Sequence, residues 1–94
     1  MNISIKDFIK IYNEVNIIDI RSRQKYNDSH ILNAKNIDKN ELILNPYKYL
    51  EKNKKYYIYC QKGTSSIRIC QILKNMGYNV YNILGGYEEW LLRK

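Results

Sequence analysis

Short apolar segments of two kinds alternate along this chain, and the alternation restricts the folds that it can adopt. Residues 16–20 and 56–59 are compact runs of strand-forming residues bounded by polar ones, which is typical of buried strands. Elsewhere apolar residues recur at helical spacing, most clearly at Ile69, Leu73 and Met76. Alternating strands and helices with short connections imply right-handed crossovers. The sequence therefore predicts an α/β fold with a mainly parallel central sheet and helices on both of its faces.

The remaining elements follow from local signals. Ser4 and Asp7 resemble a capping box, and Asn45–Pro46 provides a cap followed by a first-position proline. Residues 22–39 are polar with isolated apolar anchors, so only a short helix and a long loop are expected there. In chain order we expect a strand at 3–5, a short helix after Ser4, a strand at 16–20, the polar stretch, a helix at 45–50, a strand at 56–59, a helix from Ser65 or Ser66 to Gly77, a strand at 79–83 and a helix at 87–92.

Length and composition are those of one small globular domain. The chain has 94 residues, 45% of them hydrophobic and 27% charged, so we expect a single domain over residues 1–94. No long apolar run and no signal-peptide pattern occurs, which predicts a cytoplasmic protein without a membrane segment. The formal net charge of +7 comes from scattered lysines, and this distribution favours solvated surface lysines over a nucleic-acid site.

Cys60 occupies the most reactive position that the sequence predicts. It stands where the strand at 56–59 ends and a loop leads into the next helix. At such a junction, unpaired backbone N–H groups and the positive end of the helix dipole stabilise a thiolate. Environments of this kind lower the pKa of a cysteine from about 8.5 to between about 3.5 and 7.5. Ligands of parallel sheets bind at the carboxyl ends of strands, where Asp19 and Arg21 are also expected.

Four segments, taken in their order along the chain, resemble one known family. They are Ile18-Asp19-Ile20-Arg21; the stretch 26–37 with His30-Ile31 and Ala34-Lys35-Asn36-Ile37; the loop Cys60-Gln61-Lys62-Gly63; and the tail Gly77-Tyr78-Asn79-Val80 with Gly85-Gly86-Tyr87 and Trp90. In these features the chain is similar to single-domain members of the rhodanese (thiosulfate sulfurtransferase) family. The resemblance implies a rhodanese-like fold and a sulfurtransferase. Its Cys60 thiolate takes the outer sulfur of thiosulfate or of a persulfide or polysulfide, holds it as a persulfide, and passes it to a thiol, to cyanide or to an acceptor protein.

The loop after Cys60 is the expected binding site for the small anionic donor. The resemblance assigns substrate binding to Gln61, Lys62, Gly63, Thr64, Ser65 and Arg21. Backbone N–H groups of a tightly curled loop would converge on the terminal sulfur, and Gly63 permits the positive φ that such a loop requires. Many family members have an arginine where this chain has Ser65, so the usual anion clamp is missing. Lys62 and Arg68 are candidates to replace it, although lysine offers a point charge and no bidentate fork.

Other interpretations of these residues stay open. Without the loop arginine, the chain could be a non-catalytic rhodanese-like module that binds a partner or senses oxidants through Cys60. A cysteine phosphatase or arsenate reductase is less favoured, because Ser66 stands six positions after the nucleophile, where those enzymes need arginine. Arg21 is either a cation that faces the substrate or one half of a structural ion pair. The donor, the acceptor and the oligomeric state leave no clear mark in the sequence.

Several further residues have expected roles that are structural. Cys60, Cys70 and the lone His30 lack the spacing of a zinc site, so we expect neither a metal nor another cofactor. Cys70 lies on the apolar side of a helix and should pack in the core. His30 should anchor its loop by a hydrogen bond, and Asp19 should tie down neighbouring loops. Tyr87 and Trp90 should pack the last helix, and Gly85-Gly86 should form a tight turn, not a nucleotide loop.

Overall fold

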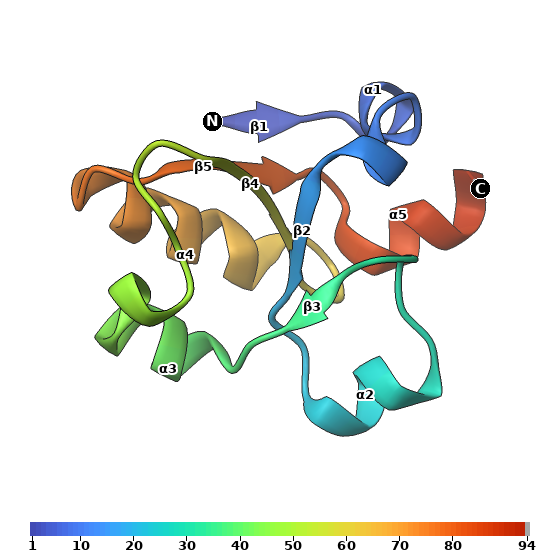
Figure 1. Cartoon of the computed structure of the whole chain (residues 1–94). Coiled ribbons are helices and arrows are strands. Elements are labelled where there is room, and N and C mark those ends of the chain that lie inside the picture. Colours follow the sequence, from blue (N-terminus) through green and yellow to red (C-terminus); the bar gives the residue numbers. More distant parts are fainter. Residues whose placement is uncertain (94) are drawn as a thin grey trace.

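Five strands form one sheet in which every neighbouring pair is parallel. The computed structural model describes residues 1–93. Its strands are β1 (Asn2–Ile3), β2 (Asn16–Asp19), β3 (Lys35–Asn36), β4 (Lys55–Tyr59) and β5 (Asn79–Ile83), in the spatial order β1-β5-β4-β2-β3. The predicted parallel α/β architecture is confirmed (Figure 1).

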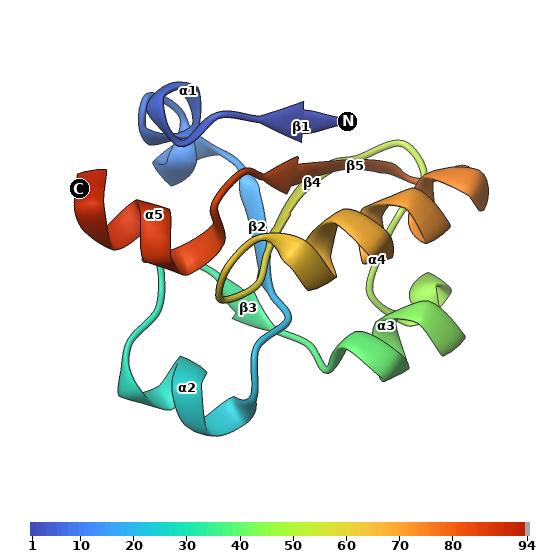
Figure 2. The same ribbon diagram turned by 180° about the vertical axis from the view of Figure 1, so that it is seen from behind.

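Helices cover both faces of the sheet (Figure 2). Five α-helices and two 3-10 turns occur in the described residues: α1 (Ile5–Ile9), η1 (Tyr12–Glu14), α2 (Arg23–Asp28), α3 (Lys39–Leu44), η2 (Pro46–Lys48), α4 (Thr64–Asn75) and α5 (Gly86–Arg93). One buried cluster joins α3 and α4 to one face of the sheet, and a second joins α1 and α5 to the other. None of the helices within residues 1–93 is long and apolar enough to cross a membrane.

Strand β4 shows how the sequence builds these two layers. Its side chains alternate, so that Tyr56 and Ile58 pack in the cluster under α3 and α4, whereas Tyr57 and Tyr59 pack in the cluster under α1 and α5. All four are buried, as expected of a central strand in a parallel sheet. The chain leaves this strand at Cys60 and enters α4, the longest helix.

Element boundaries differ from the predictions at several places. The strand expected at 3–5 ends at Ile3, because Ser4 accepts a hydrogen bond from the Asp7 N–H (3.1 Å) and thereby starts α1 at Ile5. The helix expected at 45–50 is only the 3-10 turn η2, and the Asn45 side chain donates to Glu41 instead of capping it. Strand β3 and helix α3 were missed altogether.

The start of α4 also differs from expectation. The helix begins at Thr64, and its N-cap is Gly63, not Ser65 or Ser66. Gly63 has a φ of +92°, in the left-handed region that favours glycine. The curl of the loop therefore comes from backbone conformation, and the two serines are left inside the first turn of the helix.

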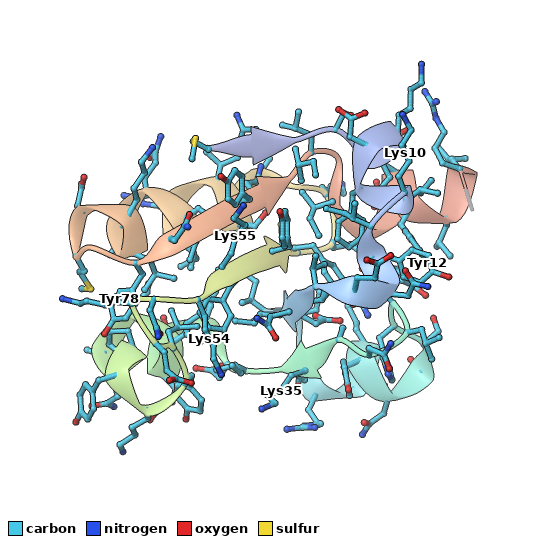
Figure 3. All side chains as sticks on the ribbon, turned by 45° about the horizontal axis from the view of Figure 1, so that its top comes forward. Lys10, Tyr12, Lys35, Lys54, Lys55 and Tyr78 are labelled. Atoms are coloured by element: carbon cyan, nitrogen blue, oxygen red, sulfur yellow. The ribbon has the colours of Figure 1, made fainter. Side chains whose placement is uncertain are left out.

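Lysines are distributed over separate elements, in agreement with their scattering in the sequence. Figure 3 shows Lys10 after α1, Lys35 on β3, and Lys54 and Lys55 at the amino end of β4. Lys54 forms an ion pair with the exposed Glu51 (2.8 Å). Exposed pairs of this kind contribute little to stability, typically about 0 to 1 kcal/mol.

Candidate active site

The candidate site lies at the carboxyl edge of the sheet, where β4 and its neighbour β2 end side by side. Asp19 pairs with Tyr59 in the last register position of the two strands, and Ile20 N–H donates to the Tyr59 carbonyl (3.1 Å) just beyond it. Cys60 directly follows β4, and Arg21 lies two residues after the end of β2. The parallel topology thus brings together residues that are forty positions apart in the sequence, as predicted for this edge.

The Cys60 sulfur receives hydrogen bonds from the curled loop. Gly63 N–H lies 3.1 Å and Ser66 N–H 3.4 Å from Sγ, and the thiol in turn donates to Ser66 Oγ (3.3 Å). Cys60 is buried, with 7% of its surface exposed. Two backbone donors at the amino end of α4 therefore point at one sulfur, which is the geometry that stabilises negative charge on a thiolate or on a persulfide.

The loop is held against the start of α5. Tyr87 N–H donates to the Cys60 carbonyl (2.9 Å) and Glu88 N–H to the Gln61 carbonyl (3.0 Å). Gly86, at φ +62°, lies so close that a Cβ atom built on it would meet the Cys60 carbonyl oxygen at 2.5 Å and the Gly63 nitrogen at 2.8 Å. The predicted tight turn at Gly85-Gly86 is present, and its second glycine also makes room for the loop.

Asp19 and Arg21 form a buried ion pair below the site. Arg21 Nη2 and Asp19 Oδ2 are 2.8 Å apart, and the carboxylate also accepts from the Arg21 N–H and from the Tyr59 hydroxyl (2.6 Å). Burial acts to lower the pKa of Arg21, but the bond and charge of Asp19 outweigh it and raise this pKa. Burial, with the Asp19 hydrogen bond second, raises the pKa of Tyr59. Both groups therefore keep their protons.

Arg21 also ties two loops together. Its Nη2 donates to the Ser29 carbonyl (2.7 Å), its Nη1 lies 3.3 Å from Gln61 Oε1, and its guanidinium stacks on the Tyr87 ring at 4.1 Å from the centroid. The predicted anchoring role of Asp19 is thus realised through Arg21. Of the two interpretations left open for Arg21, the structural ion pair is present, and Nη1 donates to the Gln61 side chain in the loop after Cys60.

A cavity of about 350 Å³ opens in front of Cys60. Its lining includes four of the predicted site residues, namely Cys60, Gln61, Ser65 and Arg21. The other three lie elsewhere: Gly63 is buried behind the sulfur, whereas Lys62 and Thr64 are exposed and do not line the cavity. Arg68, a candidate to replace the missing arginine, is exposed and does not line it either.

Two lysines of the cavity were missed by sequence reasoning. Lys25 from α2 and Lys39 from α3 line the mouth, together with Asp38, which caps α3 by accepting from the Asn40 and Glu41 N–H groups. Neither lysine forms an ion pair with another residue in the part of the chain that the structure describes. Both come from the polar stretch 22–39, in which sequence periodicity gave no guide to orientation.

Cys70 and His30 stay apart from the chemistry. Cys70 is buried in the cluster under α3 and α4, and burial raises the pKa of its thiol to about 12, so it remains protonated. His30 Nδ1 donates to the Tyr26 carbonyl (2.8 Å), and its ring stacks on Tyr26. Tyr87 and Trp90 pack in the cluster under α1 and α5, as expected. No group of three metal-binding side chains gathers within residues 1–93.

Comparison with known proteins identifies the family. The family model for the rhodanese-like domain matches residues 4–93. The thiosulfate sulfurtransferase GlpE of Coxiella burnetii is 33% identical over 78 residues, which cover 82% of this chain and 72% of that protein. The crystal structure of SSP1007 from Staphylococcus saprophyticus superimposes with a TM-score of 0.87 at 30% identity, covering 95% of this chain and 91% of the other. The human single-domain sulfurtransferase TSTD1 shares the fold, with a TM-score of 0.82 at 22% identity, covering 99% and 96% of the two chains. With this match and with Cys60 at the carboxyl edge of the sheet, the chain belongs to the rhodanese-like domain family, and two of the three similar proteins above, GlpE and TSTD1, are named sulfurtransferases.

Proposed function

We propose that this protein is a sulfurtransferase that carries sulfane sulfur as a persulfide on Cys60. The observation that supports this most is the pair of backbone N–H groups, from Gly63 and Ser66, that point at Sγ of Cys60, a residue that lines the cavity. The donor would be thiosulfate, a persulfide or a polysulfide, and the acceptor a thiol or cyanide. Two free cysteines suit the reducing conditions of the cytoplasm, which we propose as the location.

The reaction divides into two displacements at sulfur. In the first, the Cys60 thiolate attacks the outer sulfur of the donor; a new S–S bond forms, the donor's own bond to that sulfur breaks, and sulfite or a thiolate leaves with the electron pair. In the second, the acceptor attacks the terminal sulfur and the Cys60 thiolate leaves. The negative charge stays close to the Gly63 and Ser66 N–H groups throughout, so the same donors stabilise both resting forms.

The first experiment follows the mass of the intact protein. After incubation with thiosulfate or glutathione persulfide and rapid desalting, we expect the mass to increase by one sulfur atom, and cyanide should remove it. Cys60→Ser should abolish the gain, whereas Cys70→Ser, at the buried thiol that stays protonated, should retain it. No gain with thiosulfate, persulfide or polysulfide would contradict the proposal and favour a non-catalytic module.

Lys25 and Lys39, which line the cavity, help to decide whether this protein is an enzyme or a binding module. The missing loop arginine favours a module without activity, but Lys25 and Lys39 line the same cavity as Ser65, the residue that stands in place of that arginine. Asp38 offsets one of the two charges, although it is also engaged in capping α3. We infer that these lysines attract the anionic donor in place of the arginine.

A charge-selective alkylation experiment tests this role without any sulfur donor. Iodoacetate is an anion and iodoacetamide is neutral, so the ratio of their rates at Cys60 reports the potential in the cavity. At about 8 Å in water a unit charge contributes roughly 0.5 kcal/mol, so we expect about a twofold fall in the ratio for each of Lys25→Gln and Lys39→Gln. Lys35→Gln and Lys74→Gln remove the same charge from exposed positions outside this cavity and should leave the ratio unchanged. An equal fall in all four variants would show an effect of net charge alone.

A further inference from the structure

A buried polar pair stands behind Cys60 in a layer that is otherwise apolar. Ser66 on α4 and Asn82 on β5 are 0% and 1% exposed. Asn82 faces the same side of the sheet as Val80, whose neighbours in the cluster include Ile58 and Leu73. An apolar pair would fill this place without the cost of desolvating two polar groups, and replacing both partners of such a bond is often neutral for stability. Their presence therefore calls for a reason beyond packing.

Hydrogen bonds join this pair to the nucleophile and to the first strand. The Cys60 thiol donates to Ser66 Oγ (3.3 Å), the Ser66 hydroxyl donates to Asn82 Oδ1, and Asn82 Nδ2 donates to Asn2 Oδ1 (3.3 Å). A serine hydroxyl has a single proton. Because Ser66 gives it to Asn82, its oxygen turns a lone pair toward Sγ. Hydrogen bonds that run in this direction, from the thiol toward Asn2, stabilise a protonated thiol and disfavour a thiolate.

The same four residues can support the opposite charge state. An amide carries an acceptor oxygen and a nitrogen with two donor hydrogens. A half-turn of the Asn82 and Asn2 amide groups therefore reverses the donor–acceptor direction of these hydrogen bonds. Asn82 Nδ2 then donates to Ser66 Oγ, the freed Ser66 hydroxyl donates to the charged sulfur, and Asn82 Oδ1 accepts from Asn2. Asn2 is exposed, so water can solvate its amide in either orientation. In both orientations of the amides, each of these side chains keeps its hydrogen-bond partners along the series from Cys60 to Asn2.

We propose that Asn82 is a positioning residue for Cys60, and that its reversible amide lets the Ser66 hydroxyl accept from the thiol and donate to the thiolate or persulfide. The proposal rests on the proposed function only in that Cys60 must change its charge state during turnover. It predicts that side chains of the same shape at position 82, but with different hydrogen-bonding ends, will move the ionisation of Cys60 in opposite directions.

Other charged or titratable groups around the site set a background that the variants leave unchanged. They are the Asp19–Arg21 pair below Cys60, Lys25, Asp38 and Lys39 at the cavity mouth, Lys62 in the loop, Cys70 on α4, Glu88 and Glu89 at the start of α5, and the α-amino group of Met1 beside β5. No test variant alters any of them, and Asn82→Leu adds no charge of its own, so a shift in the pH profile of alkylation in the leucine variant can be assigned to the hydrogen bonds through Ser66.

The test compares the pH profile of iodoacetamide alkylation at Cys60 in Asn82→Asp and Asn82→Leu. When it is ionised, the carboxylate of the Asn82→Asp variant only accepts, which holds the Ser66 proton away from sulfur, and its negative charge also opposes the thiolate directly. The midpoint should therefore rise by about one pH unit, with roughly tenfold slower alkylation at neutral pH. Leucine offers no acceptor, so the Ser66 hydroxyl is free to donate to the Cys60 thiolate. This stabilises the thiolate, and the midpoint should fall. A residue that acts only by packing would move both variants in one direction or neither.

Two further comparisons decide the proposal if either variant fails to fold. In a Ser66→Ala background, Asn82→Leu should no longer move the midpoint. At the surface, Asn2→Asp should raise it, because a carboxylate there holds Asn82 Nδ2 away from Ser66, whereas Asn79→Asp, an exposed substitution at the other end of β5, should not. Equal shifts in Asn2→Asp and Asn79→Asp, or an unchanged leucine effect without Ser66, would overturn the proposal. Alkylation needs no sulfur donor, so a failure here is distinct from a failure of sulfur transfer.

Discussion

Replacing Asp19 with alanine is expected to lower the free energy of unfolding by about 3 to 5 kcal/mol, the usual cost of breaking a buried ion pair on one side. The Asp19 carboxylate is completely buried, and the Arg21 side chain beside it is 4% exposed. Without the carboxylate, the guanidinium stays as an uncompensated buried charge and the Tyr59 hydroxyl loses its acceptor. Urea denaturation at neutral pH, followed by circular dichroism, measures the change.

Matched substitutions separate this effect from the loss of a carboxylate in general. Asp7→Ala removes a carboxylate whose pair with Lys10 is solvent-exposed, and it should cost under about 1 kcal/mol. The double variant Asp19→Leu with Arg21→Met removes both buried charges and should recover part of the lost stability, because the penalty comes from the unpaired partner. If Asp19→Ala cost no more than Asp7→Ala, the ion pair would not be the anchor of this edge.

The elements that could be predicted are those whose evidence is local. Strand β5 runs over 79–83 as expected, and β4 exceeds the predicted 56–59 by one residue, because each is a short segment of strand-forming residues between turns. Strand β3 has two residues and exists only through its partner: Ile37 N–H donates to the Asp19 carbonyl, and the Asn36 amide donates to the Asp19 and Arg21 carbonyls. No local pattern marks a strand of that length.

The residues of the site also fall into those that local sequence predicts and those that only tertiary packing places. The sequence places Cys60 and its loop at the end of β4 because the strand, the glycine and the helix are consecutive. It does not place Lys25 and Lys39 at the mouth, since helices α2 and α3 reach the cavity only through the packing of the polar stretch. Asn82 does carry a signal in the sequence, because in the predicted strand it shares a face with Val80, and that alternation directs an amide into the core.

Gly86→Ala is expected to disable sulfur loading while the fold survives. The new Cβ would lie 2.5 Å from the Cys60 carbonyl oxygen and 2.8 Å from the Gly63 nitrogen, and both are backbone atoms that cannot turn aside. The loop must move by several tenths of an ångström or more, which takes the Gly63 N–H out of line with the sulfur. A displacement of about 1 Å in a catalytic group can cost a factor of roughly one hundred in rate. Stability should fall by about 2 kcal/mol or more, from overpacking and from the left-handed backbone.

Gly77→Ala supplies the comparison that isolates the loop. Gly77 also has a positive φ, of +97°, but a Cβ there would meet only the flexible Lys52 side chain, at 3.5 Å. It should therefore lose only the backbone contribution of about 1 to 2 kcal/mol and leave sulfur loading at Cys60 intact. Loading rates from intact mass, beside the urea midpoints of both variants, separate the two effects. If Gly86→Ala loaded sulfur as fast as Gly77→Ala, the contact between α5 and the loop would not fix the position of the Gly63 N–H on the sulfur.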